Sequence, residues 1–266
     1  MNHNQFPMPR ALLAGACRLQ TALTLTLALS LPSPAMAQTP SLPSSVQLVR
    51  TENDPLSDAA LAILREAYRR VGVDALSTPL PPERSLTALN AGEYFGDVIH
   101  MAGIDTPYPN LVRVPVPVIS FDALAFTDGR KLSLGSWADL QAHHVCIRRG
   151  IKAIERASEG LPQLSVVNQY AFIFNMLKIG RCDVAVLPHS AWLEAERLDI
   201  KGLHSIDPPL QSWPLYHYVH KSHAAIVPLL TQALQAMQKS GYLAARQAEF
   251  ERLVQNARRG IGTPAR

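Results

Sequence analysis

Short apolar strands alternate with amphipathic helices along most of this chain, and this alternation limits the fold more than any other feature. Apolar runs bounded by polar residues predict the strands, and apolar residues at three- and four-residue spacing predict the helices, with Ser57 as the first N-cap. The predicted strands are 46–50, 75–78 and 96–101, and the predicted helices are 57–71 and 83–90. Strands that alternate with helices in this way pair in parallel and are joined by right-handed crossovers.

The same alternation returns in the second half of the chain. Strands are predicted at 145–147, 164–167, 183–187 and 202–206, and helices at 150–158, 168–179 and 189–197. Two extended segments, 119–126 and 208–218, lie on either side of this second unit. Because paired connecting strands allow two lobes to close on a ligand, we predict an α/β fold of two lobes. Each lobe is expected to be a mostly parallel sheet flanked by helices, and two hinge strands join them.

Two further amphipathic helices are predicted at the end of the chain, at 224–237 and 242–257. They follow the second hinge strand, so we expect them to pack on the first lobe, which is then discontinuous in sequence. The predicted divisions are a signal peptide at 1–37, a first lobe at 46–125 and 213–258, a second lobe at 126–212 and a flexible tail at 259–266.

The first 37 residues have the pattern of a secretory signal peptide. Arg10 and Arg18 precede an apolar run at 21–31, and the small residues Ala35 and Ala37 follow it. Cleavage is predicted after Ala37. The apolar run is much shorter than the roughly 20 residues of a membrane-spanning helix, although sequence alone leaves an anchored form open. We therefore expect a secreted protein.

The composition argues against nucleic acid as a binding partner. The chain has 25 Lys and Arg against 21 Asp and Glu, a net charge of +4, and only 6% aromatic residues. The basic residues form no tract of the kind that follows a phosphate backbone.

Cys146 and Cys182 remain after cleavage, in an oxidising compartment. They form either a disulfide or two separate thiols, since bridging depends on a geometry that sequence does not give.

Several short motifs occur in an order that resembles the family 3 extracellular solute-binding proteins. They are PERSL at 82–86, SWADL at 136–140, RG at 149–150, GRCD at 180–183 and KSGYL at 239–243. The resemblance extends over about residues 46 to 255. It implies the type II periplasmic binding protein fold and a periplasmic, monomeric carrier without a cofactor. Such a carrier closes on a small-molecule solute and delivers it to an inner-membrane ABC permease, or signals to a membrane sensor.

The sequence departs from this family where amino-acid ligands are held. The family has an arginine after the third strand, for the ligand carboxylate, and this chain has Tyr108, Pro109 and Asn110. An aspartate after the third strand of the second lobe receives the ligand ammonium in the family, and Pro188 and His189 stand there instead. We therefore expect a ligand other than a standard amino acid.

Candidate ligand-binding residues follow from the strand assignment, because ligands bind at the carboxyl ends of strands in such sheets. These candidates are Glu52, Arg84, His100, Met101, Arg148, Gly150, Ile151, Lys152 and His189. The segment RRGIK at 148–152 combines a helix N-terminus with three cations, which predicts attraction for an anionic or carboxylate-bearing solute. Strand alternation points only one of Arg148 and Arg149 into the cleft.

Some candidates also have purely structural interpretations. His100 at a strand end is equally typical of a satisfied core histidine, and Arg84 is able to lie over the helix that it begins. Glu52 is also able to pair with Arg84 inside the protein. These alternatives stay open at the level of sequence.

The sequence predicts a binding protein without a metal. No nucleophile elbow, phosphate-binding loop or zinc-protease helix occurs. The alternative is an acid/base lyase or dehydratase, with Glu52 and either His100 or His189. His217, His220 and His223 are three apart on a predicted strand, so neighbouring members face opposite sides, and we expect surface or hinge histidines.

Overall fold

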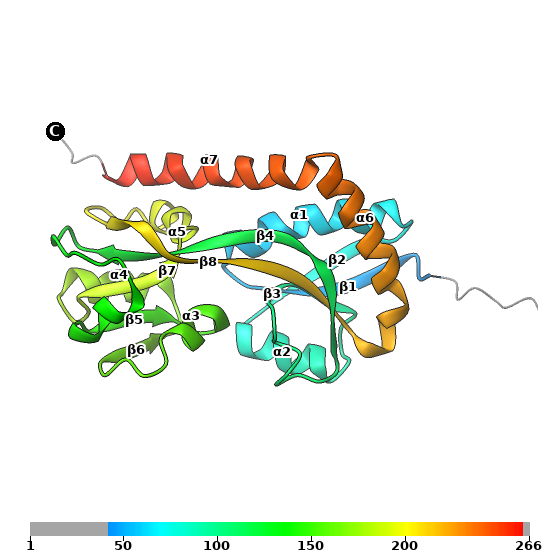
Figure 1. The fold of residues 1–266 in the computed structure, drawn as a ribbon, viewed down its shortest axis with the longest axis horizontal. Coiled ribbons are helices and arrows are strands. Elements are labelled where there is room, and N and C mark those ends of the chain that lie inside the picture. Colours follow the sequence, from blue (N-terminus) through cyan, green and yellow to red (C-terminus); the bar gives the residue numbers. More distant parts are fainter. Residues whose placement is uncertain (1–41, 263–266) are drawn as a thin grey trace, which may run out of the picture. The chain divides into compact units, whose positions relative to one another are not determined.

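The computed structural model describes residues 42–262, and the predicted signal peptide lies outside the described residues. These residues form one mixed sheet of eight strands with the order β2-β1-β3-β8-β4-β7-β5-β6 (Figure 1). The strands are β1 (Ser45–Thr51), β2 (Asp74–Leu80), β3 (Gly96–Met101), β4 (Leu111–Thr127), β5 (Val145–Arg148), β6 (Leu164–Val167), β7 (Val184–Pro188) and β8 (His204–His220). The α-helices are α1 (Pro55–Arg70), α2 (Pro82–Asn90), α3 (Lys152–Ala157), α4 (Tyr170–Lys178), α5 (Ala191–Arg197), α6 (Val227–Lys239) and α7 (Tyr242–Gly262).

Two groups of parallel strands lie at opposite ends of this sheet, which confirms the predicted two-lobed α/β fold. The first lobe is built around β1, β2 and β3, and the second lobe around β5, β6 and β7. The long strands β4 and β8 pair antiparallel with each other and run through both lobes (Figure 1). They are the two connecting strands, and the exact residues at which the lobes divide stay a prediction.

Strand β8 is longer than the sequence predicted. The expected strand at 202–206 and the expected hinge segment at 208–218 are one continuous strand. Pro208 and Pro209 interrupt the apolar pattern, and their missing amide protons remove ladder hydrogen bonds. The β4–β8 ladder shifts register between Ala123 and Ala125, opposite this part of β8, so an irregularity accommodates the prolines.

Helix α1 begins three residues earlier than a Ser57 cap implies. Asp54 is the N-cap, with its side chain accepting a hydrogen bond from the Leu56 amide at 3.3 Å, and Pro55 occupies the first helical position. Proline suits that position because its amide proton is not needed there. Ser57 is therefore buried inside the first turn, and α1 places its apolar face on the core.

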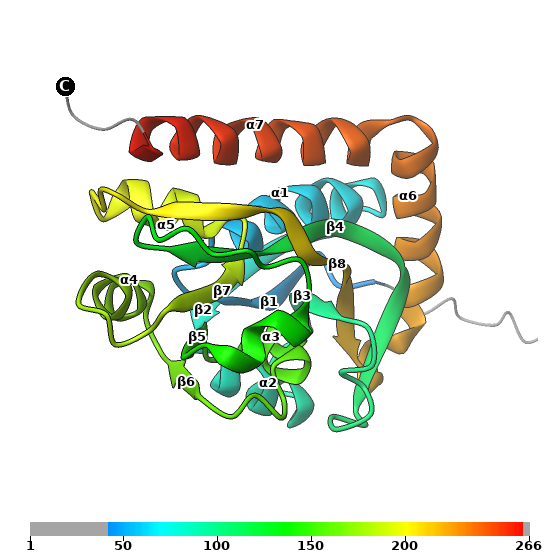
Figure 2. The same cartoon turned by 60° about the vertical axis from the view of Figure 1, so that its left-hand side comes forward.

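Helix α7 contacts both lobes, although the sequence placed it on the first. It packs against α1 and α5 and lies along both in Figures 1 and 2. Gln247 accepts a hydrogen bond from the Ser120 amide of β4 at 3.0 Å, and Arg258 pairs with Asp207 of β8 at 2.6 Å. The helix continues through Gly262, which is four residues into the segment expected to be a flexible tail.

A disulfide joins Cys146 of β5 to Cys182, which lies just before β7. Their Cα atoms are 5.9 Å apart, and both side chains are fully buried. The link therefore ties two neighbouring parallel strands of the second lobe. None of the helices between residues 42 and 262 is long and apolar enough to span a bilayer.

Candidate functional site

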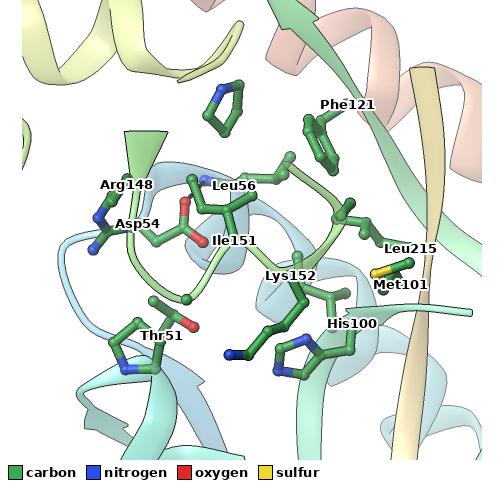
Figure 3. A pocket seen from close by; sticks show the side chains of 15 residues that line it. Thr51, Asp54, Leu56, His100, Met101, Phe121, Arg148, Ile151, Lys152 and Leu215 are labelled. Atoms are coloured by element: carbon green, nitrogen blue, oxygen red, sulfur yellow. Dashed lines mark hydrogen bonds between the residues drawn. The ribbon is translucent and has the colours of Figure 1, made fainter. Parts of the chain in front are cut away.

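A small cavity lies between the two lobes, where the carboxyl ends of four strands meet (Figure 3). Thr51, Met101, Arg148 and Pro188 are the last residues of β1, β3, β5 and β7, and all four line it. Its open volume is about 60 Å³, which is room for a few water molecules. The lobes are thus closed on each other in this structure.

Close contact between Gly150 of the second lobe and the Pro82 side chain of the first helps to close the cavity. Gly150 has φ of +89°, and a Cβ atom at this position would overlap the side chain of Pro82 at the start of α2. Only glycine allows both the left-handed backbone and this close approach.

Arg148 is the most deeply buried cation that lines the cavity. Its residue is 4% exposed, and its guanidinium lies over the ring of Tyr170, 4.6 Å from the ring centroid. One terminal nitrogen donates to the carbonyl oxygen of Glu52 at 3.1 Å, across the cleft. Its Nε has no hydrogen-bond partner among the described residues. A buried guanidinium whose Nε–H donor has no acceptor favours binding of an anionic ligand.

Asp54 brings a carboxyl group from the first lobe to the same cavity (Figure 3). Burial raises the pKa of Asp54, and the positive charge of Arg148 partly offsets that rise. The two groups therefore attract each other across the cleft, and the N-cap of α1 is also part of the site.

Lys152 carries the second cation, and acidic side chains surround it. It pairs with Glu83 of the first lobe and, at 2.9 Å, with Glu155 of its own helix. The other oxygen of Glu155 accepts the Gly150 amide at 2.6 Å. The amide expected to attract an anion is therefore already bonded, and α3 begins only at Lys152. Two carboxylates already pair with the Lys152 ammonium, so attraction for an anion rests on the Arg148 side chain rather than on Lys152 or the helix end.

Asp97 is a buried acid that the sequence analysis did not select. Its Oδ2 lies 3.0 Å from Nε2 of His100, which lines the cavity. The β3–β8 ladder shifts register between these two residues, so the pair depends on a β-bulge. The one signal in the sequence was an aspartate inside an apolar strand, three residues before a histidine.

Six of the nine predicted ligand-binding residues line this one cavity. They are His100, Met101, Arg148, Gly150, Ile151 and Lys152. The sequence reasoning did not select Asp54, Pro82, Phe121 and Leu215, which line it as well. Phe121 and Leu215 belong to β4 and β8, whose apolar pattern is also that of core strands.

The other three predicted residues lie elsewhere. Glu52 lines an adjoining groove, and Arg84 is exposed on α2. The Nδ1 atom of His189 accepts from the Asp122 amide at 3.0 Å, and its Nε2 lies 3.1 Å from Glu251 of α7. His189 thus links β4 to α7. The pairing of Glu52 with His100 or His189 that acid/base catalysis would need is not assembled in one cavity.

The three histidines near the end of β8 have separate roles. His217 was expected to be a surface or hinge histidine; it lies on the connecting strand β8 but is fully buried, with Nε2 2.8 Å from the Tyr68 hydroxyl and Nδ1 2.6 Å from the Asp97 carbonyl oxygen. Burial lowers its pKa to about 4. His220 bonds Ser222, and His223 stacks on Phe95. Between residues 42 and 262 no three His, Cys, Asp or Glu side chains gather as metal ligands would.

Comparison with known proteins identifies the fold through structure. No family model and no curated protein matches the sequence. A histidine kinase sensor domain with similarity to periplasmic binding proteins superposes with a TM-score of 0.67 at 15% identity, covering 77% of this chain and 95% of that domain. An ancestral arginine-binding protein bound to glutamine gives 0.63 at 16% identity, with 79% and 99% covered.

A third similar structure is an ancestral amino-acid-binding protein that is a precursor of cyclohexadienyl dehydratase. Its TM-score is 0.64 at 14% identity, over 78% of this chain and 95% of that one. The three proteins differ in their described roles, and the identities are low, so what they share with this chain is architecture. The chain has the two-lobed fold of the periplasmic binding proteins, with its candidate site in the cleft between the lobes.

Proposed function

We propose that this protein captures a small carboxylate-bearing solute between its lobes by closure about β4 and β8. The observation that carries the proposal is the buried Arg148 guanidinium, which lines the interlobe cavity with its Nε unpaired. Burial of a cation without a full set of acceptors is costly, and an anion at this position supplies them. Lys152 lines the same space, where Glu83 and Glu155 pair with its ammonium group.

The protein is proposed to act in the periplasm and to hand its solute to a membrane transporter. The pattern of residues 1–37 supports export, and a disulfide in the second lobe suits an oxidising compartment. One similar structure is the substrate-binding protein of an amino acid ABC transporter, with a TM-score of 0.62 and 14% identity.

Calorimetric titration of the mature protein with organic acids, neutral solutes and cationic solutes tests this proposal. We expect one or more carboxylates to bind, and Arg148→Gln to weaken that binding by at least about tenfold, because the bound carboxylate then loses its charged hydrogen-bond donor. Arg149→Gln is the matched control. It removes the neighbouring arginine, which bonds Asn168 in the adjoining groove, and should leave the affinity unchanged.

Binding of cationic solutes alone would contradict the proposal. Mass spectrometry of any small molecule that remains bound through purification identifies the ligand class directly. Recovery of the same molecule unchanged after long incubation supports a carrier, and appearance of a product would instead favour the lyase or dehydratase alternative.

A sensor for a membrane signalling partner is the second candidate. It is favoured by the structural similarity to a histidine kinase sensor domain, with a TM-score of 0.67. Carrier and sensor share the site and the closure, and they differ in the partner that recognises the closed form. Solute uptake that depends on the protein supports the carrier, whereas ligand-dependent phosphorylation in a membrane partner supports the sensor.

A further inference from the structure

Helix α7 links the two lobes a third time, beside the connecting strands β4 and β8. It follows α6 after the two residues Ser240 and Gly241, and α6 packs on α1 and β4. The helix then runs along α1 of the first lobe and α5 of the second (Figures 1 and 2). Lobes that close by rotation need only their connecting strands, so a third link restrains the movement.

The first half of α7 is attached to the first lobe and to a connecting strand. The Arg70 guanidinium of α1 lies 5.8 Å from the ring centroid of Tyr242, in the first turn. Gln247 bonds both backbone groups of Ser120 in β4, accepting from the amide at 3.0 Å and donating to the carbonyl oxygen at 3.3 Å. Ser120 stands opposite Pro214 of β8, which has no amide proton, so Gln247 supplies a donor that β8 lacks there.

The second half of α7 is held on the second lobe by a buried apolar stripe. The stripe consists of side chains three or four residues apart, each 4% exposed or less: Phe250, Val254, Ala257 and Ile261. The Phe250 ring meets the ring of His189, just after β7, edge-on at 5.7 Å. Arg258 pairs with Asp207 of β8 at 2.6 Å and lies 6.0 Å from the ring centroid of Trp192 in α5. Side-chain packing and the pair of Arg258 with Asp207 thus hold this half in place.

Opening of the cleft moves α5 relative to α1, and α7 contacts both. A helix is stiff, because backbone hydrogen bonds join each turn to the next, so α7 cannot lengthen to follow both lobes. A close-packed interface stays intact or separates, since it does not deform continuously. The link to α6 and the two bonds to β4 keep the first half of α7 in place. The half beyond Gln247 is therefore the part that separates.

We propose that α7 is a strap that holds the lobes closed in the absence of a solute. In the closed form the stripe from Phe250 to Ile261 packs on the second lobe. Opening the cleft to admit a solute requires this half of the helix to leave α5. The stripe opposes that step, because its apolar side chains then become exposed to water. The strap acts on the lobes themselves, so it does not depend on which solute binds.

A charge placed in the stripe tests this role in the free mature protein. Ala257→Glu puts a carboxylate at a 0% exposed position, so the end of α7 should leave α5. Hydrogen exchange of the amides of residues 250–261 should then be at least about tenfold faster than in wild type. Small-angle X-ray scattering should give a larger radius of gyration. Ala248→Glu is the matched control, because Ala248 lies on the exposed side of the same helix, and it should behave as wild type.

Phe250→Ala is a milder change with the same two measurements, for use if Ala257→Glu does not fold. Leu253→Ala, on the exposed face, is its control. We expect faster exchange and a larger radius to occur together. Faster exchange at an unchanged radius would show that α7 does not hold the lobes closed. A larger radius at unchanged exchange would show that the lobes open without release of α7. Wild-type values in both would show that the stripe does not attach α7 to the second lobe, and any of these three results would overturn the inference.

Discussion

At the scale of single residues, the charge state of His217 is tied to folding. It is fully buried, and burial lowers its pKa to about 4 from the ordinary value of 6.5. Between these two values the unfolded chain takes up a proton that the native protein does not, so stability falls as the pH falls through this window. From pH 7 to pH 5 this histidine is expected to cost about 2 kcal/mol of the free energy of unfolding.

Urea denaturation at both pH values measures this loss. His217→Gln should flatten the pH dependence by about the same 2 kcal/mol, whatever it does to stability at neutral pH. His204→Gln removes an exposed histidine at the start of the same strand and should keep the wild-type pH dependence. If the two variants share the wild-type slope, His217 does not have the lowered pKa.

The positions of some of these side chains could be predicted from the sequence, and those of others could not. Strand alternation at a strand end predicts that one of Arg148 and Arg149 faces the cleft, because neighbouring residues of a regular strand face opposite sides, and the structure shows that Arg148 is the one that lines the cavity. Asp97 does not follow, since the bulge in β3 breaks that alternation. The burial of His217 was hidden for another reason. Its partners, Tyr68 and Asp97, are far away in the sequence and meet it only after the lobes are built.

At the scale of elements, α7 is expected to stabilise the whole described structure through its buried face. Val254 is 1% exposed and belongs to the main hydrophobic core, whereas its neighbour Leu253 is 52% exposed. Val254→Ala should lower the free energy of unfolding by about 1 to 2 kcal/mol, because it leaves a small cavity. Leu253→Ala, the matched control, should change it by less than about 0.5 kcal/mol. Denaturant unfolding measures both, and equal losses would mean that another face of the helix is buried.

The periodic spacing of apolar residues predicted where most helices and strands lie, but not which elements they pack against. The strands β3 and β6 begin and end where the sequence predicted, since each is a clear apolar run bounded by turn residues. The contact of α7 with α5 was not predicted. A helix with one apolar stripe packs wherever an apolar face is available, and chain order alone suggested only the first lobe.

At the scale of the whole described structure, the closed arrangement of the lobes depends on the small size of Gly150. Gly150→Ala adds a methyl group that overlaps Pro82 across the cleft, so the lobes should separate in the free protein. Small-angle X-ray scattering should then give a larger radius of gyration than for wild type. Gly160→Ala is the matched control, because Gly160 has a similar φ of +85° and no atom within 4 Å of the added methyl group.

Both variants carry the backbone strain of a left-handed alanine, roughly 1 kcal/mol, so both should lose a comparable part of their stability for that reason. Only Gly150→Ala should also change the scattering, and only this variant should lose the interlobe contacts of Lys152 with Glu83 and of Arg148 with Glu52. Hydrogen exchange at the carboxyl ends of β1 and β5 reports that loss. Identical scattering from the two variants would show that Gly150 does not control closure, and that the side-chain contacts alone hold the lobes together.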